Sequence, residues 1–131
     1  MASSGYATEA TVESIWDDTF DTTRFNNINS HIGTKFNFWI TRASATDITN
    51  TDVAAILAAE TSDLIIYYYS IAKERKVSNP WDFIQMAITK LSMGDNFYYY
   101  FEKTIKLCQD ILNESKRIAY TSTLDLPSHG D

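Results

Sequence analysis

The sequence has few of the residues on which most enzyme and metal chemistry depends. Its 131 residues include one cysteine, Cys108, and two histidines, His31 and His129. A single cysteine excludes an internal disulfide framework and any site built from several cysteines. Neither histidine has a partner at metal-ligand spacing. We therefore expect no catalytic residues, no cofactor and no metal, with Cys108 buried and inert and His31 in a structural or exposed role.

Positive charge and long hydrophobic runs are also scarce. The chain has 11 Lys and Arg against 17 Asp and Glu, a net charge of −6. This balance argues against a dedicated nucleic-acid binder, whose affinity depends on cations that neutralise phosphates, and favours a basic protein partner. The apolar run at residues 64–69 is far shorter than the ~20 residues of a membrane helix. The first residues lack the basic and apolar regions of a signal peptide, so we expect a cytosolic protein with no membrane contact.

Glycine and proline are rare as well, with four and two residues, while 44% of the chain is hydrophobic. This composition is typical of a globular protein, and the length suits one domain with a core of its own. We expect a single helical domain over residues 1–131, with flexible ends at about 1–6 and 121–131.

Apolar residues recur at steps of three and four along most of the chain, which predicts amphipathic helices. The expected helices are a short one after Thr8, one from Asp21 to Ala43, a central one from Thr51 to about Lys76, one from Asn79 to Leu91, and one from Phe97 to about Tyr120. Residues 97–101 are five consecutive aromatics, so a strand is the alternative there. The predicted fold is an all-α bundle of four to five helices with extended polar termini.

The strongest interruption in the second half of the chain is Met93-Gly94-Asp95-Asn96. Glycine adopts the left-handed conformation that closes a helix, and Asp or Asn can cap the next one. We therefore expect Gly94 to end one helix and Asp95 or Asn96 to begin the last.

Two tyrosine trios, residues 67–69 and 98–100, are the most unusual feature of the composition. Three consecutive helical residues fan around most of the axis, so at most two of each trio can face one core. At least one of each faces outward, either as plain surface or toward a partner. We expect an interface that includes four tyrosines: Tyr67, Tyr69, Tyr98 and Tyr99.

Charges of opposite sign gather in two places. Asp17 and Asp18 are acidic, and a basic cluster follows later with Lys73, Arg75 and Lys76. We expect these groups to meet across a subunit boundary. A divalent cation at residues 17–21, and with it a metal-assisted enzyme, is a weaker alternative, because the alternating ligands and glycine of a calcium loop are missing.

The order of elements resembles a known family. Tyr6-Ala7-Thr8 precedes a short helix, further helices follow, and the segment Ser92-Met93-Gly94-Asp95 comes late in the chain. This is similar to the head-tail connector (adaptor) proteins of tailed viruses over residues 6–118, although the motifs are short. The aromatic run at residues 97–101 departs from the family, whose segment usually continues into an extended tail.

The resemblance implies a structural virion protein without catalytic residues, assembled in the host cytoplasm. It implies a closed ring of identical subunits, twelve as is usual for such connectors, between the portal and tail proteins. The alternative hypothesis from a different class is a small cytosolic helical adaptor, or an inhibitor that uses its acidity to bind a basic protein.

Overall fold

A computed structural model of the chain describes residues 5–42 and 48–124, with the side chains described through Ile118. Within these residues there are six helices and no strand, so the predicted all-α fold is confirmed. The helices are α1 (Glu9–Glu13), α2 (Thr22–Thr41), α3 (Thr51–Glu74), α4 (Pro80–Leu91), α5 (Asn96–Tyr100) and α6 (Glu102–Leu124).

The count exceeds the expected four to five because the last predicted helix is two. Phe101, with φ −109° and ψ 23°, leaves the helical conformation and separates the short α5 from α6. Residues 96–100 are helical, so the strand alternative for the aromatic run was wrong. The single helix predicted from Phe97 onward is therefore two consecutive helices, the short α5 and the long α6.

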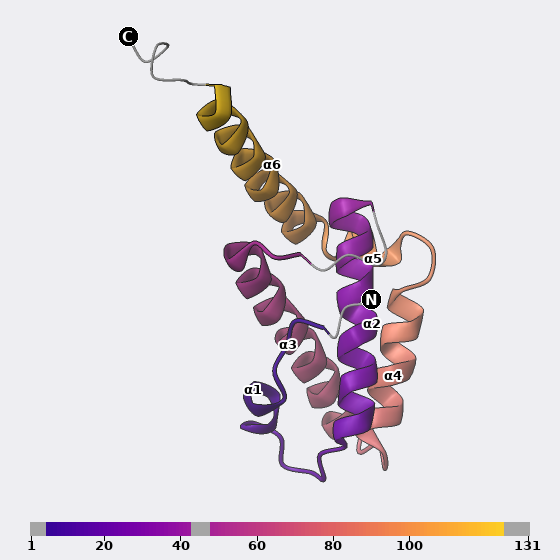
Figure 1. The fold of residues 1–131 in the computed structure, drawn as a ribbon. Helices are drawn as coiled ribbons and strands as arrows, with labels where there is room; N and C mark the ends of the chain where they lie inside the picture. The colour runs from indigo at the N-terminus through magenta and orange to yellow at the C-terminus, as the bar shows by residue number, and fades with distance from the viewer. Residues whose placement is uncertain (1–4, 43–47, 125–131) are drawn as a thin grey trace.

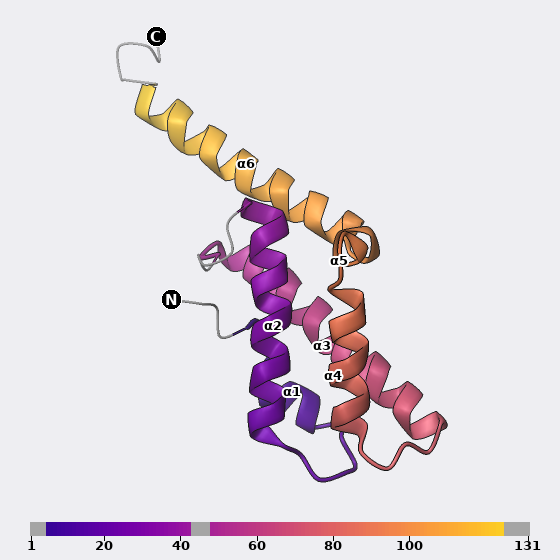
Figure 2. The same ribbon diagram turned by 90° about the vertical axis from the view of Figure 1, so that its right-hand side faces the viewer.

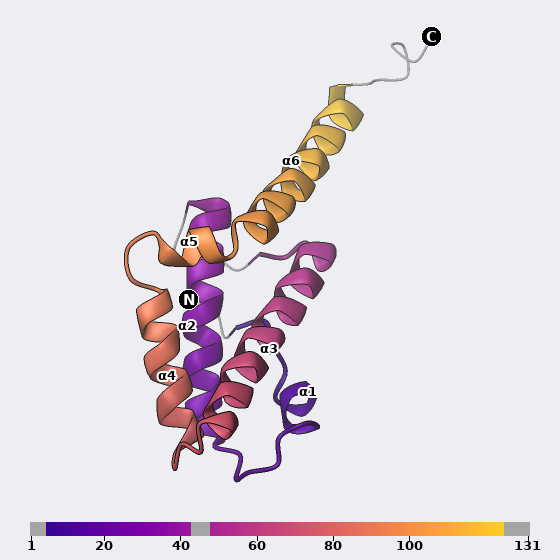
Figure 3. The ribbon, with the colours of Figure 1, turned by 180° about the vertical axis from the view of Figure 1, so that it is seen from behind.

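α3, which spans the region predicted to form the central helix, packs on α1, α2, α4 and α6. α3 and α4 pack on each other, and α2 contacts both of them (Figure 1). The short α1 lies against α3, as Figure 3 shows from behind. At the far end of the body α5 follows α4, and the start of α6 packs on α2 and α3.

Side-chain caps set three of the helix starts. Asp21 accepts a hydrogen bond from the Arg24 backbone N–H at 3.0 Å, and Asn50 accepts from two backbone N–H groups of the first turn of α3. Asn79 caps α4 ahead of Pro80, as predicted, because proline at the first helical position has no N–H to leave unpaired. These polar residues satisfy backbone donors that the helices themselves leave open.

The core is continuous and largely aliphatic and aromatic. α2 presents Phe25, Ile32 and Phe36 to it, each at most 1% exposed, and the buried residues of the other helices surround this row. Gly33 is buried and does not interrupt α2. Removing this apolar surface from water is the main source of stability for such a body.

The N-terminal segment is held more firmly than expected. The Tyr6 hydroxyl donates to the Asn37 side-chain oxygen, and the Asn29 side chain accepts from the Ala7 backbone N–H at 3.1 Å. Gly5 has φ +97°, and a Cβ there would lie 2.4 Å from the Asn29 side chain. Gly5 and Tyr6, which fall in the end expected to be flexible, thus lie against α2, while residues 1–4 lie outside the described ranges.

The long α6 leaves the body instead of ending on it. Ile105 and Cys108 in its first half are fully buried, whereas every residue from Asn113 to Ile118 is exposed. Figure 2 shows the helix running away from the other helices. It continues to Leu124, into the range expected to be a flexible end, and residues 125–131 lie outside the described part. Within the described residues, no helix combines the length and apolar character needed to cross a membrane.

Candidate interaction surfaces

Tyr69 is a core residue and not the exposed contact residue that we expected. Its side chain is 6% exposed, and its ring stacks on Trp16 with 3.7 Å between centroids. The Tyr69 hydroxyl donates to the Asp17 carboxylate and accepts from the Asp17 backbone N–H at 3.3 Å. Of the three positions in its trio, this one faces the segment after α1, and its polar end is satisfied there.

The acidic and basic clusters meet within one chain. The Lys73 ammonium lies 3.2 Å from Asp18 and 3.6 Å from Asp17. The hydrogen bond to Asp18, followed by the charges of both carboxylates, raises the pKa of Lys73. These three residues pair with one another, so they need no neighbouring subunit, contrary to the expectation for them.

The other two expected cations end α3 at the surface. Arg75 lies over the Phe83 ring, 5.7 Å from its centroid, and Lys76 adopts φ 57° where the chain turns toward α4. Both side chains are exposed, and neither forms an ion pair with a residue in the described ranges. They remain available for a partner.

The remaining tyrosines divide between a packed and an exposed set. Tyr98 is half-buried against Trp39, with 5.1 Å between ring centroids. Tyr67 and Tyr99 are 52% and 68% exposed, as expected. Tyr100, which we did not select, is 51% exposed.

Tyr67, Tyr68 and Tyr100 form one patch across α3 and α5. Tyr67 and Tyr68 have ring centroids 5.3 Å apart. Burial, followed by the neighbouring Tyr100 and Tyr67 hydroxyls, raises the pKa of Tyr68. Glu60 and Asp63 lie beside Tyr67 and Tyr100 at one end of this patch.

A groove runs between α3 and α4 and begins at Tyr68. We call it the α3–α4 groove; its volume is about 440 Å³. Most of its lining is apolar, and the lining side chains include two cations and no carboxylate. The lining residues are Tyr68, Ile71, Arg75, Phe83, Met86, Ala87, Lys90, Leu91 and Asn96.

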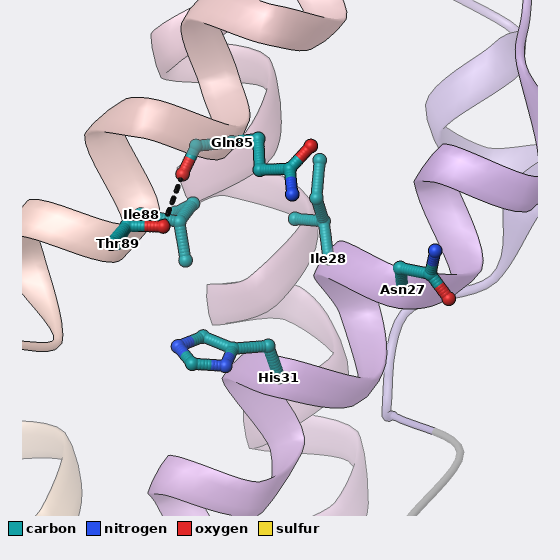
Figure 4. A pocket seen from close by; sticks show the side chains of 6 residues that line it. All are labelled: Asn27, Ile28, His31, Gln85, Ile88 and Thr89. Atoms are coloured by element: carbon teal, nitrogen blue, oxygen red, sulfur yellow. Dashed lines mark hydrogen bonds between the residues drawn. The ribbon is translucent and has the colours of Figure 1, made fainter.

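A second cavity lies between α2 and α4 and is smaller, at about 140 Å³. Figure 4 shows its lining side chains: His31 points from α2 toward the Ile88 and Thr89 turn of α4, and Ile28 and Gln85 lie at the other side. Burial, followed by the charge of Lys35, lowers the pKa of His31. The volume is too small for a typical small-molecule ligand, for which pockets of roughly 300 Å³ or more are usual.

His31 also contacts the segment that ends α4. Its Nε2 atom lies 2.9 Å from the Ser92 hydroxyl oxygen, and Ser92 donates its own proton to the Ile88 carbonyl oxygen at 2.8 Å. Ser92 therefore accepts from an Nε2–H group. Gly94 follows with φ +55°, as the predicted left-handed terminator, and Asp95 occupies the N-cap position of α5. The segment 92–95 thus ends α4 and ties it to α2.

The groups considered for chemistry have structural partners. Cys108 is fully buried, and burial, followed by the charge of Glu60, raises the pKa of its thiol to about 11. Glu60 accepts from the Thr104 hydroxyl at 3.2 Å. Among the described residues, no three His, Cys, Asp or Glu side chains are placed to hold a metal ion. His129 lies outside the described ranges.

Sequence reasoning missed the α3–α4 groove and Tyr100. Phe83 and Met86 were not selected because single apolar residues on a helix normally belong to the core, whereas Met86 is 50% exposed. The only signal in the sequence was that α4 carries more apolar residues than its buried face needs. No protein-family model matches the chain, and no curated protein or solved structure is significantly similar to it.

Proposed function

We propose that this chain is a structural subunit that assembles with copies of itself, in the manner of the head-tail connector proteins that form a ring between the portal and the tail of a tailed virus. The observation that carries the proposal is α6, which extends from the body and exposes Leu107 in its first half and Ile118 in its outer half, at 49% and 53%. A helix of this kind gains most of its stability from packing of its apolar side chains on something else.

The exposed aromatic surface supports the same role. Tyr67, Tyr99 and Tyr100 expose half or more of their side chains on neighbouring parts of the body. Tyrosine is enriched in protein interfaces because it offers a large apolar face and one hydrogen-bonding end. Portal and tail proteins are the partners that a connector ring would contact, and the assembled virion is where it would reside.

Size-exclusion chromatography with multi-angle light scattering, followed by native mass spectrometry, tests the proposal. A ring gives a mass that is a fixed multiple of the 14.9 kDa subunit, and the multiple is the ring order. We expect this species to grow with protein concentration and to bind a portal complex. A protein that stays monomeric at every concentration and does not bind a portal contradicts the proposal, and a monomer that binds basic proteins instead supports the adaptor or inhibitor hypothesis.

A further inference from the structure

We infer that the exposed side of α6 in one copy of the chain docks into the α3–α4 groove of a second copy. The inference rests on the proposed self-assembly and specifies its contact. The docking side of α6, which we call the α6 stripe, consists of the exposed Leu107 and Ile118 and of Ile111 between them, which is half-buried against the core. The occupant of the groove is therefore a helix of the same protein.

The α6 stripe has the spacing of one helical face. Ile111 follows Leu107 by four residues and Ile118 follows Ile111 by seven, so the three side chains project along one line of α6. They lie beside the face that carries Ile105 and Cys108 into the core. The Asn50 side-chain N–H donates to the Ser115 hydroxyl oxygen at 3.3 Å, and the exposed Ile118 lies three residues further along α6.

The α3–α4 groove is suited to receive such a helix. Its apolar lining from Ile71, Phe83 and Met86 is open to solvent, and apolar helix faces are commonly bound in grooves between two other helices. Methionine adapts to different side-chain shapes, which favours its use in a binding groove. Burying the α6 stripe there removes apolar surface of both copies from water.

The charges of the two surfaces are complementary. Arg75 and Lys90 belong to the groove lining, and neither forms an ion pair with another described residue. On α6, Asp110 borders the stripe three residues after Leu107. Glu114 borders it four residues before Ile118, where it also pairs with Arg117 at 2.5 Å. Docking brings these carboxylates toward the two cations, which fixes the orientation of the helix more than it adds affinity.

One chain cannot fill its own groove. In Figure 2 the outer end of α6 points to the upper left, away from the body, while the end of α3 that lines the groove lies at the lower right. The contact therefore joins two different surfaces of two copies. Contacts of this kind repeat from copy to copy, and they close into a ring when the rotation between neighbours allows it.

Serine variants at exposed positions test the contact without disturbing the core. Ile118→Ser changes the stripe and Met86→Ser the groove, and Ile15→Ser is the matched control, because Ile15 belongs to neither surface and is exposed to 54%, against 53% for Ile118. We expect Ile118→Ser and Met86→Ser to be folded monomers by circular dichroism and light scattering, and Ile15→Ser to assemble as wild type. Mixing the two monomeric variants restores one intact contact and gives dimers that do not grow further.

Cross-linking gives a second readout of the same contact. Single-cysteine additions Ile118→Cys and Met86→Cys are treated with a short bismaleimide, separately and mixed; the native Cys108 is buried and does not interfere. We expect covalent dimers in the mixture and none with either variant alone. Dimers from Ile118→Cys alone would mean a symmetrical contact and would overturn the inference.

The outcomes separate this inference from the proposed function. If wild type assembles and Ile118→Ser assembles equally well, self-assembly stands and the docking of α6 in the groove is wrong. If wild type is monomeric at every concentration and does not bind a portal, both are wrong.

Discussion

Trp16 stacks on Tyr69 with 3.7 Å between ring centroids and 28° between ring planes. On its other side Trp16 stacks on Trp81, at 4.7 Å and 25°. The three rings come from the segment after α1, from α3 and from α4, so they join three separate parts of the chain. The Trp81 ring N–H also donates to the Thr19 carbonyl oxygen at 3.3 Å, which closes the segment between α1 and α2 over the stack.

Substitutions at Tyr69 should therefore act on stability. Tyr69→Phe keeps the ring and removes the hydroxyl that bonds Asp17, at a cost of about 1–2 kcal/mol in the free energy of unfolding. Tyr69→Ser also removes the ring and leaves a cavity beside Trp16, and core truncations of aromatic residues cost about 3–5 kcal/mol. Urea denaturation followed by tryptophan fluorescence measures both steps.

Tyr99→Ser is the control for this series, because Tyr99 is 68% exposed. Its free energy of unfolding should stay within about 0.5 kcal/mol of wild type, as is usual for exposed positions. Equal losses for Tyr69→Ser and Tyr99→Ser would contradict the burial of Tyr69.

Local signals in the sequence were enough for most of the helices. Asp21, Asn79 and Pro80 act at short range through backbone groups of their own helix, so their roles could be read from residue type and position. Gly94 could be recognised for the same reason. The break at Phe101 could not, because neither Phe nor its neighbours carries a helix-ending signal.

The long-range partners of Tyr69 could not be predicted from the sequence. The trio limits how many of its rings face a core, but it does not say which one does. That choice depends on where the segment after α1 packs on α3. Asp17, which belongs to this segment, is 52 residues away from Tyr69 along the chain. The α3–α4 groove could not be predicted for the same reason, because it exists only where two separate helices cross and leave Met86 exposed and Phe83 half-buried.

Two glycines with left-handed backbone give a matched pair of predictions. Gly94 has φ +55° and open space around the position of a Cβ, so Gly94→Ala should cost only the conformational strain of about 1–2 kcal/mol. Gly5 has φ +97°, and its Cβ would lie 2.7 Å from the Asn29 backbone carbon, which cannot move as a side chain can. Gly5→Ala should therefore displace the segment that carries Tyr6. In thermal unfolding it should lower the melting temperature more than Gly94→Ala does.

Hydrogen exchange separates the effects of these two glycine substitutions. Gly5→Ala should increase exchange at the Ala7 amide, which donates to the Asn29 side chain at 3.1 Å. Gly94→Ala should leave that amide unchanged. Equal stabilities and unchanged exchange in Gly5→Ala would show that the N-terminal segment does not pack on α2.

Cys108 should be unreactive until the protein opens. Burial raises the pKa of its thiol to about 11, so the reactive thiolate is almost absent at neutral pH. We expect a slow reaction with a thiol reagent in the native protein and a fast one in urea. Lys106→Cys, on an exposed position of the same helix, should react quickly in both conditions, and a fast reaction of native Cys108 would contradict its burial.

His31 should make stability depend on pH in a defined direction. Burial and Lys35 lower the pKa of His31 below its ordinary value of 6.5, so the unfolded chain binds a proton at His31 more readily than the folded chain. Proton uptake at His31 then favours unfolding. The stabilisation of the folded state by neutral His31 is complete above pH 6.5, and it is lost as the pH falls through 6.5 toward the pKa of His31 in the folded chain. His31→Gln keeps a side-chain N–H that can donate to Ser92 but does not titrate. Between about pH 7.5 and about pH 5 the melting temperature of wild type should fall more than that of His31→Gln.

Nuclear magnetic resonance titration should place the pKa of His31 below 6.5, and Lys35→Gln should raise it, because this substitution removes the charge that opposes protonation. A pKa of His31 at or above 6.5, or parallel melting curves for wild type and His31→Gln, would mean that the cavity between α2 and α4 does not hold the imidazole in its neutral form.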